Sequence, residues 1–236
     1  MKCIILAGGF GTRLAEETTN IPKPMVMING QPILWHLMSI YAKQGFTNFV
    51  IATGYKSEVI DKWVSTITNN WNVETLDTGL HTQTGGRIAQ CVSKFPMDSK
   101  FFLTYGDGLS NVNLKNLEVS HAKSKKMVTL TAVRPPARFG YIKVRKRIGY
   151  NLVTKFGEKN QADEGWINGG FFIINKEVVD YIDSNTNSFE IDSLPLIAKD
   201  KQLNAYKHEN FWKPMDTLRD KNELNELAKN NKAPWL

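Results

Sequence analysis

The stretch CIILAGGFGTRL, residues 3–14, decides the fold, because an apolar run passes directly into a glycine-rich loop. Residues 3–7 are continuously apolar, which is typical of a strand buried on both faces in a parallel sheet. Gly8, Gly9 and Gly11 are able to take a positive φ, which turns backbone amides toward a phosphate. The loop lacks the Gly-Lys-Ser/Thr ending of a P-loop and a full G-x-G-x-x-G, so alone it fits either a tight turn or a phosphate-binding loop.

Strands and helices alternate from this loop to about residue 105. Such alternation predicts a right-handed doubly wound sheet, which binds ligands at the carboxyl ends of its strands, where the glycine loop lies. The further predicted strands are residues 48–53, 71–76 and 100–105, and the predicted helices are residues 31–45, 57–67 and 85–92.

The second part of the chain has a different pattern, with strand-like segments and few helices between them. We therefore expect a mixed sheet in a single α/β domain over residues 1–236, closed by a helix over residues 217–231 that Thr217 caps. The predicted strands here are residues 127–133, 140–144, 152–156, 169–175 and 203–208, the last at an edge of the sheet.

The composition argues against several classes of protein. The formal net charge is +7, but the basic runs, residues 123–126 and 143–147, are short and lack interleaved aromatic residues. A pocket for a polyanionic small molecule is therefore favoured over a nucleic-acid surface. Because no apolar run approaches the roughly 18 residues of a membrane span and no leader precedes the first strand, we expect a cytoplasmic protein without a membrane partner. Cys3 and Cys91 are expected to be buried thiols.

Three side chains in and after the loop suit phosphate chemistry. Thr12 provides a hydroxyl, and Arg13 provides a planar fork of donors that matches a polyphosphate. Lys23 stands between two prolines in IPKPM, which hold the backbone extended and suit a lysine that brings a point charge to a reacting phosphate. Taken alone, Arg13 also fits an exposed side chain at a turn, and Lys23 a solvated lysine in a proline loop.

Two aspartates are candidate metal ligands. Asp107 lies between glycines at the carboxyl end of an apolar strand, where a carboxylate suits Mg²⁺ and the glycines leave room for a nucleotide. Asp216, in FWKPMDT, is the candidate second ligand. Because it also precedes the closing helix, Asp216 alternatively shares the capping of that helix with Thr217.

These motifs together resemble those of the sugar-1-phosphate nucleotidylyltransferases. LAGGFGTRL, IPKPM, YGDG, the Glu158-Lys159 pair and NGGFF occur in the order of that family along nearly the whole chain. TQTGGR, PPARFG and FWKPMDTLRDK resemble its cytidylyltransferase branch. The resemblance implies a Rossmann-like doubly wound fold of the nucleotide-diphospho-sugar transferase (GT-A-like) type. It also implies a Mg²⁺-dependent reaction of CTP with glucose 1-phosphate that yields CDP-glucose and pyrophosphate.

The resemblance assigns the nucleotide to residues 1–110. Within this half, Arg13 and Lys23 are the expected catalytic cations, and Asp107 would hold Mg²⁺ together with Asp216 of the other half. The residues expected to bind the nucleotide are Leu6, Ala7, Gly8, Gly9, Gly11, Thr12, Arg13, Thr82, Arg87 and Gly106.

The resemblance assigns the sugar to residues 111–236 and implies a homo-oligomer. Considered without the family, Glu158 and Lys159 fit a surface ion pair, and Trp212 and Trp235 fit core or subunit-contact aromatics. The residues expected around the sugar phosphate are Lys23, Gly140, Glu158, Lys159, Asn168 and Gly169.

The chain departs from the family in two places. The segment between Trp63 and Trp71 is shorter than the resemblance implies, which bears on CTP selectivity and on self-association. Asn160 stands where the family has proline after Glu158-Lys159, which loosens the sugar-side loop. UTP or dTTP and other sugar 1-phosphates therefore remain alternative substrates.

Two other classes of function fit a nucleotide-sugar site. A glycosyltransferase that consumes a finished nucleotide sugar commonly carries Asp-x-Asp at a strand end, but residues 106–108 are Gly-Asp-Gly. A non-catalytic sensor would bind CTP or CDP-glucose without turnover. Release of pyrophosphate from a triphosphate separates both classes from the nucleotidylyltransferase.

Overall fold

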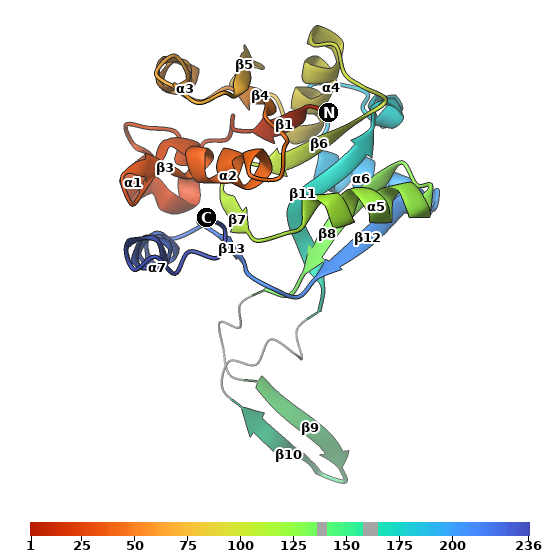
Figure 1. The fold of residues 1–236 in the computed structure, drawn as a ribbon. Coiled ribbons are helices and arrows are strands. Elements are labelled where there is room, and N and C mark those ends of the chain that lie inside the picture. Colours follow the sequence, from red (N-terminus) through yellow and green to blue (C-terminus); the bar gives the residue numbers. More distant parts are fainter. Residues whose placement is uncertain (136–140, 158–164) are drawn as a thin grey trace.

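A seven-stranded sheet forms the centre of the molecule, with helices on both faces (Figure 1). The computed structural model describes residues 1–135, 141–157 and 165–236. The strands of the sheet lie in the order β12-β8-β11-β6-β1-β4-β5. Their bounds are β1 (Cys3–Leu6), β4 (Asn48–Thr53), β5 (Asn72–Asp77), β6 (Lys100–Tyr105), β8 (Val128–Val133), β11 (Ile167–Asn175) and β12 (Leu203–His208).

The N-terminal half of the sheet is doubly wound, as predicted. β1 pairs in parallel with β4 on one side and with β6 on the other, and β4 pairs in parallel with β5. The strand order therefore reverses at β1, and the crevice between the carboxyl ends of β1 and β6 is the switch point where such sheets bind ligands. β11 runs antiparallel to β6 and β8, which makes the sheet mixed. The predicted α/β fold class is confirmed.

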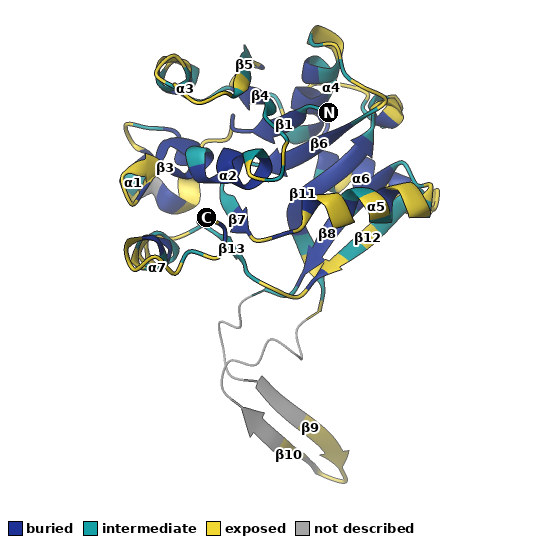
Figure 2. Cartoon of the chain, viewed as in Figure 1, coloured by how far each residue is buried: buried dark blue, intermediate teal, exposed yellow. Residues whose placement is uncertain are grey.

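Each face of the sheet packs against its own apolar core. Successive residues of β1 point to opposite faces, so Cys3 and Ile5 join one core, whereas Ile4 and Leu6 join the other. The first core includes residues of α2 (Ile33–Ala42), α3 (Ser57–Val64), α5 (Leu114–Ser124) and α7 (Leu218–Lys229), and the second includes residues of α4 (Thr84–Lys94), η4 (Lys176–Tyr181), η5 (Phe189–Ser193) and α6 (Leu194–Lys199). Figure 2 shows the central strands buried, with exposed residues on the outer sides of α3, α5 and α7, whereas α2 has none.

Short elements complete the fold around the sheet. β9 and β10 form an antiparallel hairpin that extends away from it (Figure 1). β7 pairs with β13, and β2 pairs with β3, in two-stranded ladders. These elements are η1 (Thr12–Leu14), α1 (Ala15–Thr18), η2 (Lys23–Met25), β2 (Met27–Ile28), β3 (Gln31–Pro32), β7 (Gly108–Ser110), β9 (Tyr141–Arg147), β10 (Tyr150–Gly157) and β13 (Trp212–Pro214).

The helix α5 is absent from the sequence-based expectation. Its buried side combines Leu114 and Leu117 with the polar His121, so the apolar signal at helical spacing is weak. Asn113 caps its start, since the side-chain oxygen accepts a hydrogen bond from the Asn116 amide at 2.8 Å. The closing helix α7 begins as predicted, with Thr217 as its N-cap.

Both cysteines are buried free thiols, as predicted. Burial raises the pKa of Cys91 to about 12 and that of Cys3 still further, so neither is a thiolate at neutral pH. Within the described ranges, no helix combines the length and apolar character needed to cross a bilayer.

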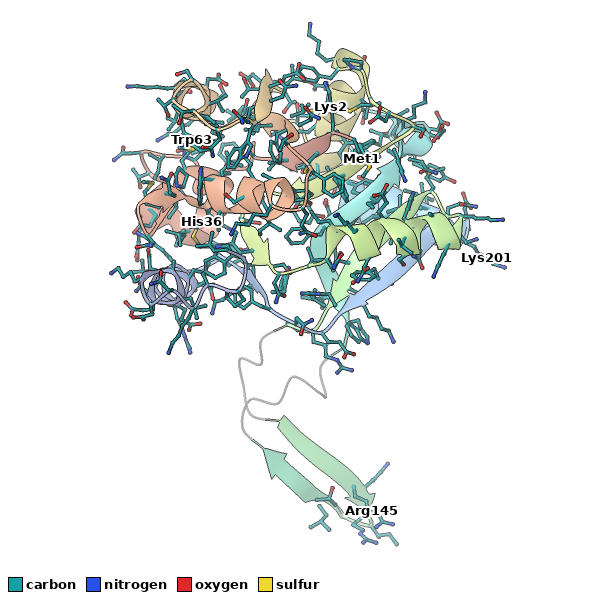
Figure 3. All side chains as sticks on the ribbon, viewed as in Figure 1. Met1, Lys2, His36, Trp63, Arg145 and Lys201 are labelled. Atoms are coloured by element: carbon teal, nitrogen blue, oxygen red, sulfur yellow. The ribbon has the colours of Figure 1, made fainter. Side chains whose placement is uncertain are left out.

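Buried histidines couple the stability of the fold to pH. Burial lowers the pKa of His36, His121 and His208 below the usual value for histidine. His36 lies on α2 (Figure 3) and has a hydrogen-bond partner at each ring nitrogen. Trp235 Nε1 lies 3.2 Å from Nδ1 of His36, and the Ile28 carbonyl oxygen lies 2.8 Å from Nε2. This pairing needs one ring nitrogen without a proton, so a second proton on the ring would break it.

Stability is expected to decrease as the pH falls below about 6.5. The unfolded chain takes up protons on its histidines near that pH, whereas the folded chain takes them up only at lower pH, so acid favours unfolding. Urea midpoints measured from about pH 7.5 down to about pH 5.5 should decrease steadily. A constant midpoint would contradict the assignment, and substitution of the exposed His81 by asparagine should leave the pH profile unchanged.

Candidate active site

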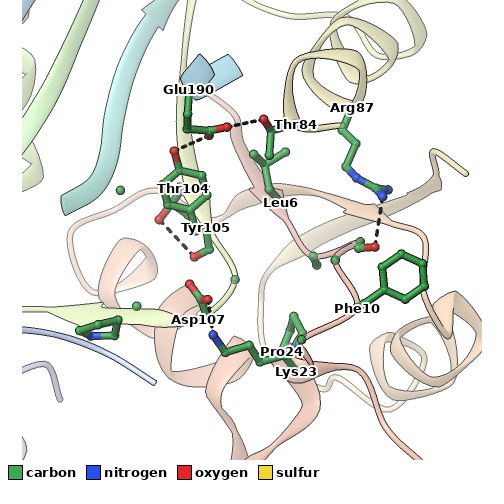
Figure 4. A pocket seen from close by; sticks show the side chains of 18 of the residues that line it. Leu6, Phe10, Lys23, Pro24, Thr84, Arg87, Thr104, Tyr105, Asp107 and Glu190 are labelled. Carbon is green, nitrogen blue, oxygen red and sulfur yellow. Dashed lines mark hydrogen bonds and ion pairs between the residues drawn. The ribbon is translucent and has the colours of Figure 1, made fainter. Parts of the chain in front are cut away.

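A pocket of about 710 Å³ opens at the carboxyl ends of β1 and β6 (Figure 4). This volume is typical of small-molecule sites. Gly140, Glu158 and Lys159 lie outside the described residues, but every other predicted site residue lines the pocket. These residues are Leu6, Ala7, Gly8, Gly9, Gly11, Thr12, Arg13, Lys23, Thr82, Arg87, Gly106, Asp107, Asn168, Gly169 and Asp216.

The glycine-rich loop differs from the expectation in its backbone. Of its glycines, only Gly11 has a positive φ, of 66°. Gly8 provides space instead, since a Cβ there would lie 2.1 Å from Nη1 of Arg87. A Cβ on Gly9 would meet nothing within 4 Å, so Gly9 borders open space. The expectation of a positive φ is therefore wrong for Gly8 and Gly9, and the loop leaves room for a ligand at Gly9.

Arg87 supports this loop from inside the protein. Only 4% of the residue is exposed. Burial lowers the pKa of Arg87, although the negative charge of Asp77 acts to raise it. Its Nη1 donates to the Thr53 carbonyl oxygen at 2.7 Å and to the Thr78 hydroxyl, and its Nη2 donates to the Gly8 carbonyl oxygen at 3.1 Å. Because these acceptors belong to two strand ends and the loop, Arg87 fixes the surface on which a nucleotide would lie.

Lys23 reaches the pocket from a 3₁₀ turn. Pro22 has an extended backbone, with φ −71° and ψ 151°, but Lys23 begins η2, and the Val26 amide donates to the Lys23 carbonyl oxygen at 3.1 Å. The prediction of an extended segment therefore holds for Pro22 and is wrong for Lys23, because Pro24 is compatible with a first helical turn, where no N–H donor is needed. With 9% of the residue exposed, Lys23 is not a solvated loop lysine.

A two-stranded ladder brings Asp107 and Asp216 together. β7 directly follows Asp107, and its first residue, Gly108, pairs with Pro214 at the end of β13, two residues before Asp216. The Met215 amide also donates to the Asp107 carbonyl oxygen at 2.9 Å. The pairing explains how residues distant in the sequence share one site.

The side chain of Asp216 faces the pocket cations rather than capping α7. Its Oδ1 lies 2.8 Å from Lys23 Nζ, and its Oδ2 lies 3.3 Å from Nη1 of Arg13. The capping box of α7 is formed by Thr217 and Asp220 instead. These contacts favour the pocket role of the Asp216 side chain over the capping alternative.

Lys23 links the two aspartates. Its Nζ lies 2.7 Å from Asp107 Oδ2, a contact drawn in Figure 4, in addition to the contact with Asp216. Burial alone would lower the pKa of Lys23, but the charges of Asp107 and Asp216 outweigh it and raise the pKa. Lys23 is therefore a cation at neutral pH, held by both carboxylates.

The same two carboxylates fit a divalent cation. Among the described residues there is no group of three or more His, Cys, Asp and Glu side chains that could hold a metal by itself. Mg²⁺ is commonly held by one or two carboxylates, with phosphate oxygens of a substrate and water as further ligands. The oxygens of Asp107 and Asp216 already share one cation, so this donor set suits Mg²⁺ bound together with a nucleotide.

The charge of the pocket is balanced. The net charge of +7, from which a polyanionic ligand was expected, is not concentrated in the described residues that line the pocket. Part of this positive charge lies on the exposed tip of the β9–β10 hairpin, where Arg145 is labelled in Figure 3. A polyphosphate would therefore need added positive charge, which a divalent cation supplies. The charged residues of the lining are Arg13, Lys23, Arg87, Asp107, Glu190 and Asp216.

The second wall of the pocket comes from β11. Asn168 Nδ2 donates to the Tyr105 hydroxyl at 3.2 Å, and its Oδ1 accepts from the Gly170 amide at 2.9 Å. Gly170 has φ 79°, and a Cβ there would lie 2.6 Å from the Tyr105 ring. Trp212, another lining residue, donates from Nε1 to the Gly169 carbonyl oxygen at 2.7 Å. The glycines of the NGGFF motif thus let β11 lie close to Tyr105, and the motif provides the side-chain amide of Asn168 in a fixed orientation.

Tyr105, Thr84 and Glu190 line the pocket but were missed from the sequence (Figure 4). The Tyr105 hydroxyl donates to Glu190 Oε1 and the Thr84 hydroxyl donates to Glu190 Oε2, both at 2.5 Å. Burial and then the charge of Glu190 raise the pKa of Tyr105, so its phenol stays a neutral donor. Tyr105 precedes Gly106-Asp107 and could have been found from that position. Glu190 stands between two apolar residues of η5, and no motif around it in the sequence indicates a role in the site.

Comparison with known proteins agrees with this geometry. A family model described as nucleotidyl transferase matches residues 2–229. The chain belongs to the nucleotidyl transferase family. The glucose-1-phosphate cytidylyltransferase of Salmonella typhimurium is 41% identical to this nucleotidyl transferase over 257 aligned residues, which cover 100% of the chain and 98% of the relative. The sequence-based prediction of the family is confirmed.

Further relatives span other members of the family. The mannose-1-phosphate guanyltransferase of Saccharomyces cerevisiae is 32% identical over 97% of this nucleotidyl transferase and 66% of the relative. The crystal structure of HddC from Yersinia pseudotuberculosis superposes with a TM-score of 0.75 at 27% identity, covering 95% of this chain and 98% of HddC. HddC complexed with GMP-PN superposes with the same TM-score.

The alignment with the Salmonella typhimurium relative is longer than this nucleotidyl transferase. Its 257 aligned positions exceed the 236 residues of the chain by 21, so the relative contains segments that this chain lacks. The sequence predicts such a difference between Trp63 and Trp71. In the structure this segment connects the end of α3 at Val64 to the start of β5 at Asn72.

Proposed function

We propose that this nucleotidyl transferase makes CDP-glucose and pyrophosphate from CTP and α-D-glucose 1-phosphate. The observation that carries the proposal is that every described residue predicted for the site lines one pocket at the switch point of the sheet. The full-length relative with 41% identity supports the choice of CTP and glucose 1-phosphate.

The proposed reaction is an in-line substitution at phosphorus. A phosphate oxygen of glucose 1-phosphate forms a bond to the α-phosphorus of CTP, while the bond from that phosphorus to the oxygen shared with the β-phosphate breaks and pyrophosphate leaves. No proton has to move at the reacting atoms, so alignment and charge neutralisation provide the catalysis. Lys23 is proposed to neutralise the reacting phosphate, and Arg13 to bind the departing polyphosphate.

The two halves of the chain are proposed to hold the two substrates. The nucleotide would lie along the glycine loop, between residues 6–13 and Thr82, and the hexose would lie against Asn168 and Gly169. Asp107 and Asp216 would hold Mg²⁺, which when bound supplies positive charge to the phosphates. The support for this arrangement is the shared pocket and the cation already held between both carboxylates.

A matrix of nucleotides and sugar 1-phosphates tests the proposal. CTP, UTP, dTTP and GTP would each be combined with glucose 1-phosphate or mannose 1-phosphate and Mg²⁺, with pyrophosphate release as the readout. The expected result is that CTP with glucose 1-phosphate is the preferred pair. Turnover with UTP, dTTP or GTP but not with CTP would overturn the cytidylyl assignment. Binding of CTP without turnover in any combination would favour the sensor.

Glu190 is proposed to bind the hexose. A carboxylate offers about four acceptor positions, and the Tyr105, Thr84 and Ser188 hydroxyls donate to three. Glu190→Gln is therefore expected to raise KM for glucose 1-phosphate about tenfold or more and to leave KM for CTP unchanged, since one oxygen acceptor becomes a donor. Steady-state kinetics with each substrate varied in turn measures both constants. An equal rise in both would contradict a sugar-side role, and the exposed Glu209→Gln is the matched control.

A cytoplasmic location and self-association belong to the same proposal. The free thiols of Cys3 and Cys91 suit a reducing compartment. Exposed apolar side chains on the β9–β10 hairpin, including Val144, Leu152 and Val153, favour contact with another copy of the chain. Sedimentation velocity of the purified protein reports the oligomeric state.

A further inference from the structure

Lys23 lies where a cation bound by Asp107 and Asp216 would lie. Its ammonium is within 2.8 Å of one oxygen from each carboxylate, and only 9% of the residue is exposed. The three residues come from η2, from the turn between β6 and β7 and from the segment after β13, so the contact is built by the fold rather than by neighbours in the sequence. Arg13 adds a second cation to Asp216.

The ammonium and a divalent cation compete for the same carboxylate oxygens. A Mg²⁺ ion bound to both carboxylates would lie about 2.0–2.1 Å from their oxygens, and Lys23 Nζ already lies 2.7 Å and 2.8 Å from those oxygens. Two cations that share these oxygens would lie within a few ångström of one another, and the repulsion between them is large in a partly buried site. Binding of a metal ion by both carboxylates therefore favours departure of Lys23 from them.

We infer that Lys23 is an internal counter-cation that keeps the metal site closed until a polyphosphate draws its ammonium away. That the ligand is a polyphosphate rests on the proposed function. That Lys23 competes with a metal ion rests on the ion pairs alone. The consequence is that metal and nucleotide promote each other's binding through Lys23, in addition to any direct contact between metal and phosphate. Without nucleotide, the protein should bind divalent cations weakly.

Mn²⁺ binding followed by electron paramagnetic resonance, without nucleotide or sugar, tests this inference. Lys23→Met is expected to bind Mn²⁺ at least about tenfold more tightly than the unaltered protein, because the competing charge is gone. Lys100→Met, which removes a lysine paired with Glu118 outside the pocket, should not change the affinity. Adding Asp107→Asn to Lys23→Met should abolish the gain.

Equal Mn²⁺ affinity in Lys23→Met and the unaltered protein would overturn the inference, as would a gain that survives Asp107→Asn. Lys23→Gln, which keeps a polar group, repeats the test if the methionine variant folds poorly. A thermal shift provides a second readout, because Mn²⁺ should raise the melting temperature of the Lys23 variants more than that of the unaltered protein. Since no substrate is present, the outcome does not depend on whether CDP-glucose is formed.

Discussion

Replacing Lys23 with alanine is expected to lower kcat for CDP-glucose formation by about a thousandfold. The change removes a buried cation that is proposed to meet the reacting phosphate, and it leaves the pocket with more carboxylates than cations. Charge that develops on the phosphates in the transition state would then lack its main protein partner. Pyrophosphate release at saturating CTP and glucose 1-phosphate measures the effect.

The same variant distinguishes catalysis from folding. Lys23→Ala should keep the circular dichroism spectrum of the unaltered protein, because the residue lies in a short turn and its partners face the pocket. Lys100→Ala is the matched control and should retain full activity, since that lysine does not line the pocket. Activity of Lys23→Ala within about threefold of normal would show that another group supplies the charge.

Asp107→Asn is expected to reduce turnover by a factor of similar size, about a thousandfold. The amide keeps the shape of the side chain but loses the charge that pairs with Lys23 and that would bind Mg²⁺. The concentration of Mg²⁺ needed for half-maximal activity should therefore rise in this variant. No such rise is expected for Lys23→Ala. Titration of Mg²⁺ at fixed substrates measures this difference.

A normal Mg²⁺ response in Asp107→Asn would contradict the assignment of Asp107 as a metal ligand. Asp98→Asn is the matched control, since Asp98 pairs with the N-terminal ammonium and does not line the pocket. Asp216→Asn should resemble Asp107→Asn, because both oxygens that contact Lys23 belong to the same proposed metal site.

The central strands were predictable because burial on both faces makes them continuously apolar. β4 and β6 begin and end where the sequence predicts. α5 was not predictable, because His121 occupies a buried position through hydrogen bonds to Thr129 and Asn175 that only the tertiary structure reveals. The antiparallel β11 also depends on pairing with β6 and β8, which a strand pattern alone does not specify.

The candidate site was predictable where a motif combines chemistry with a strand end. Asp107 and the glycine loop follow neighbouring parallel strands, and Leu6 lies opposite Tyr105 in the register, so their meeting follows from the predicted sheet. The contact between Lys23 and Asp216 depends on the β7–β13 ladder, which no sequence pattern indicated. Glu190 belongs to the site only because η5 packs beside α4, where Thr84 meets it.

The direct test of the proposed reaction follows the phosphate of glucose 1-phosphate into the product. The protein would be incubated with CTP, Mg²⁺ and glucose 1-phosphate that carries heavy oxygen on its phosphate, and the products would be analysed by mass spectrometry. Attack of that phosphate on the α-phosphorus predicts CDP-glucose that keeps all of the heavy oxygen and pyrophosphate that carries none. Heavy oxygen in the pyrophosphate, or pyrophosphate without CDP-glucose, would contradict the account.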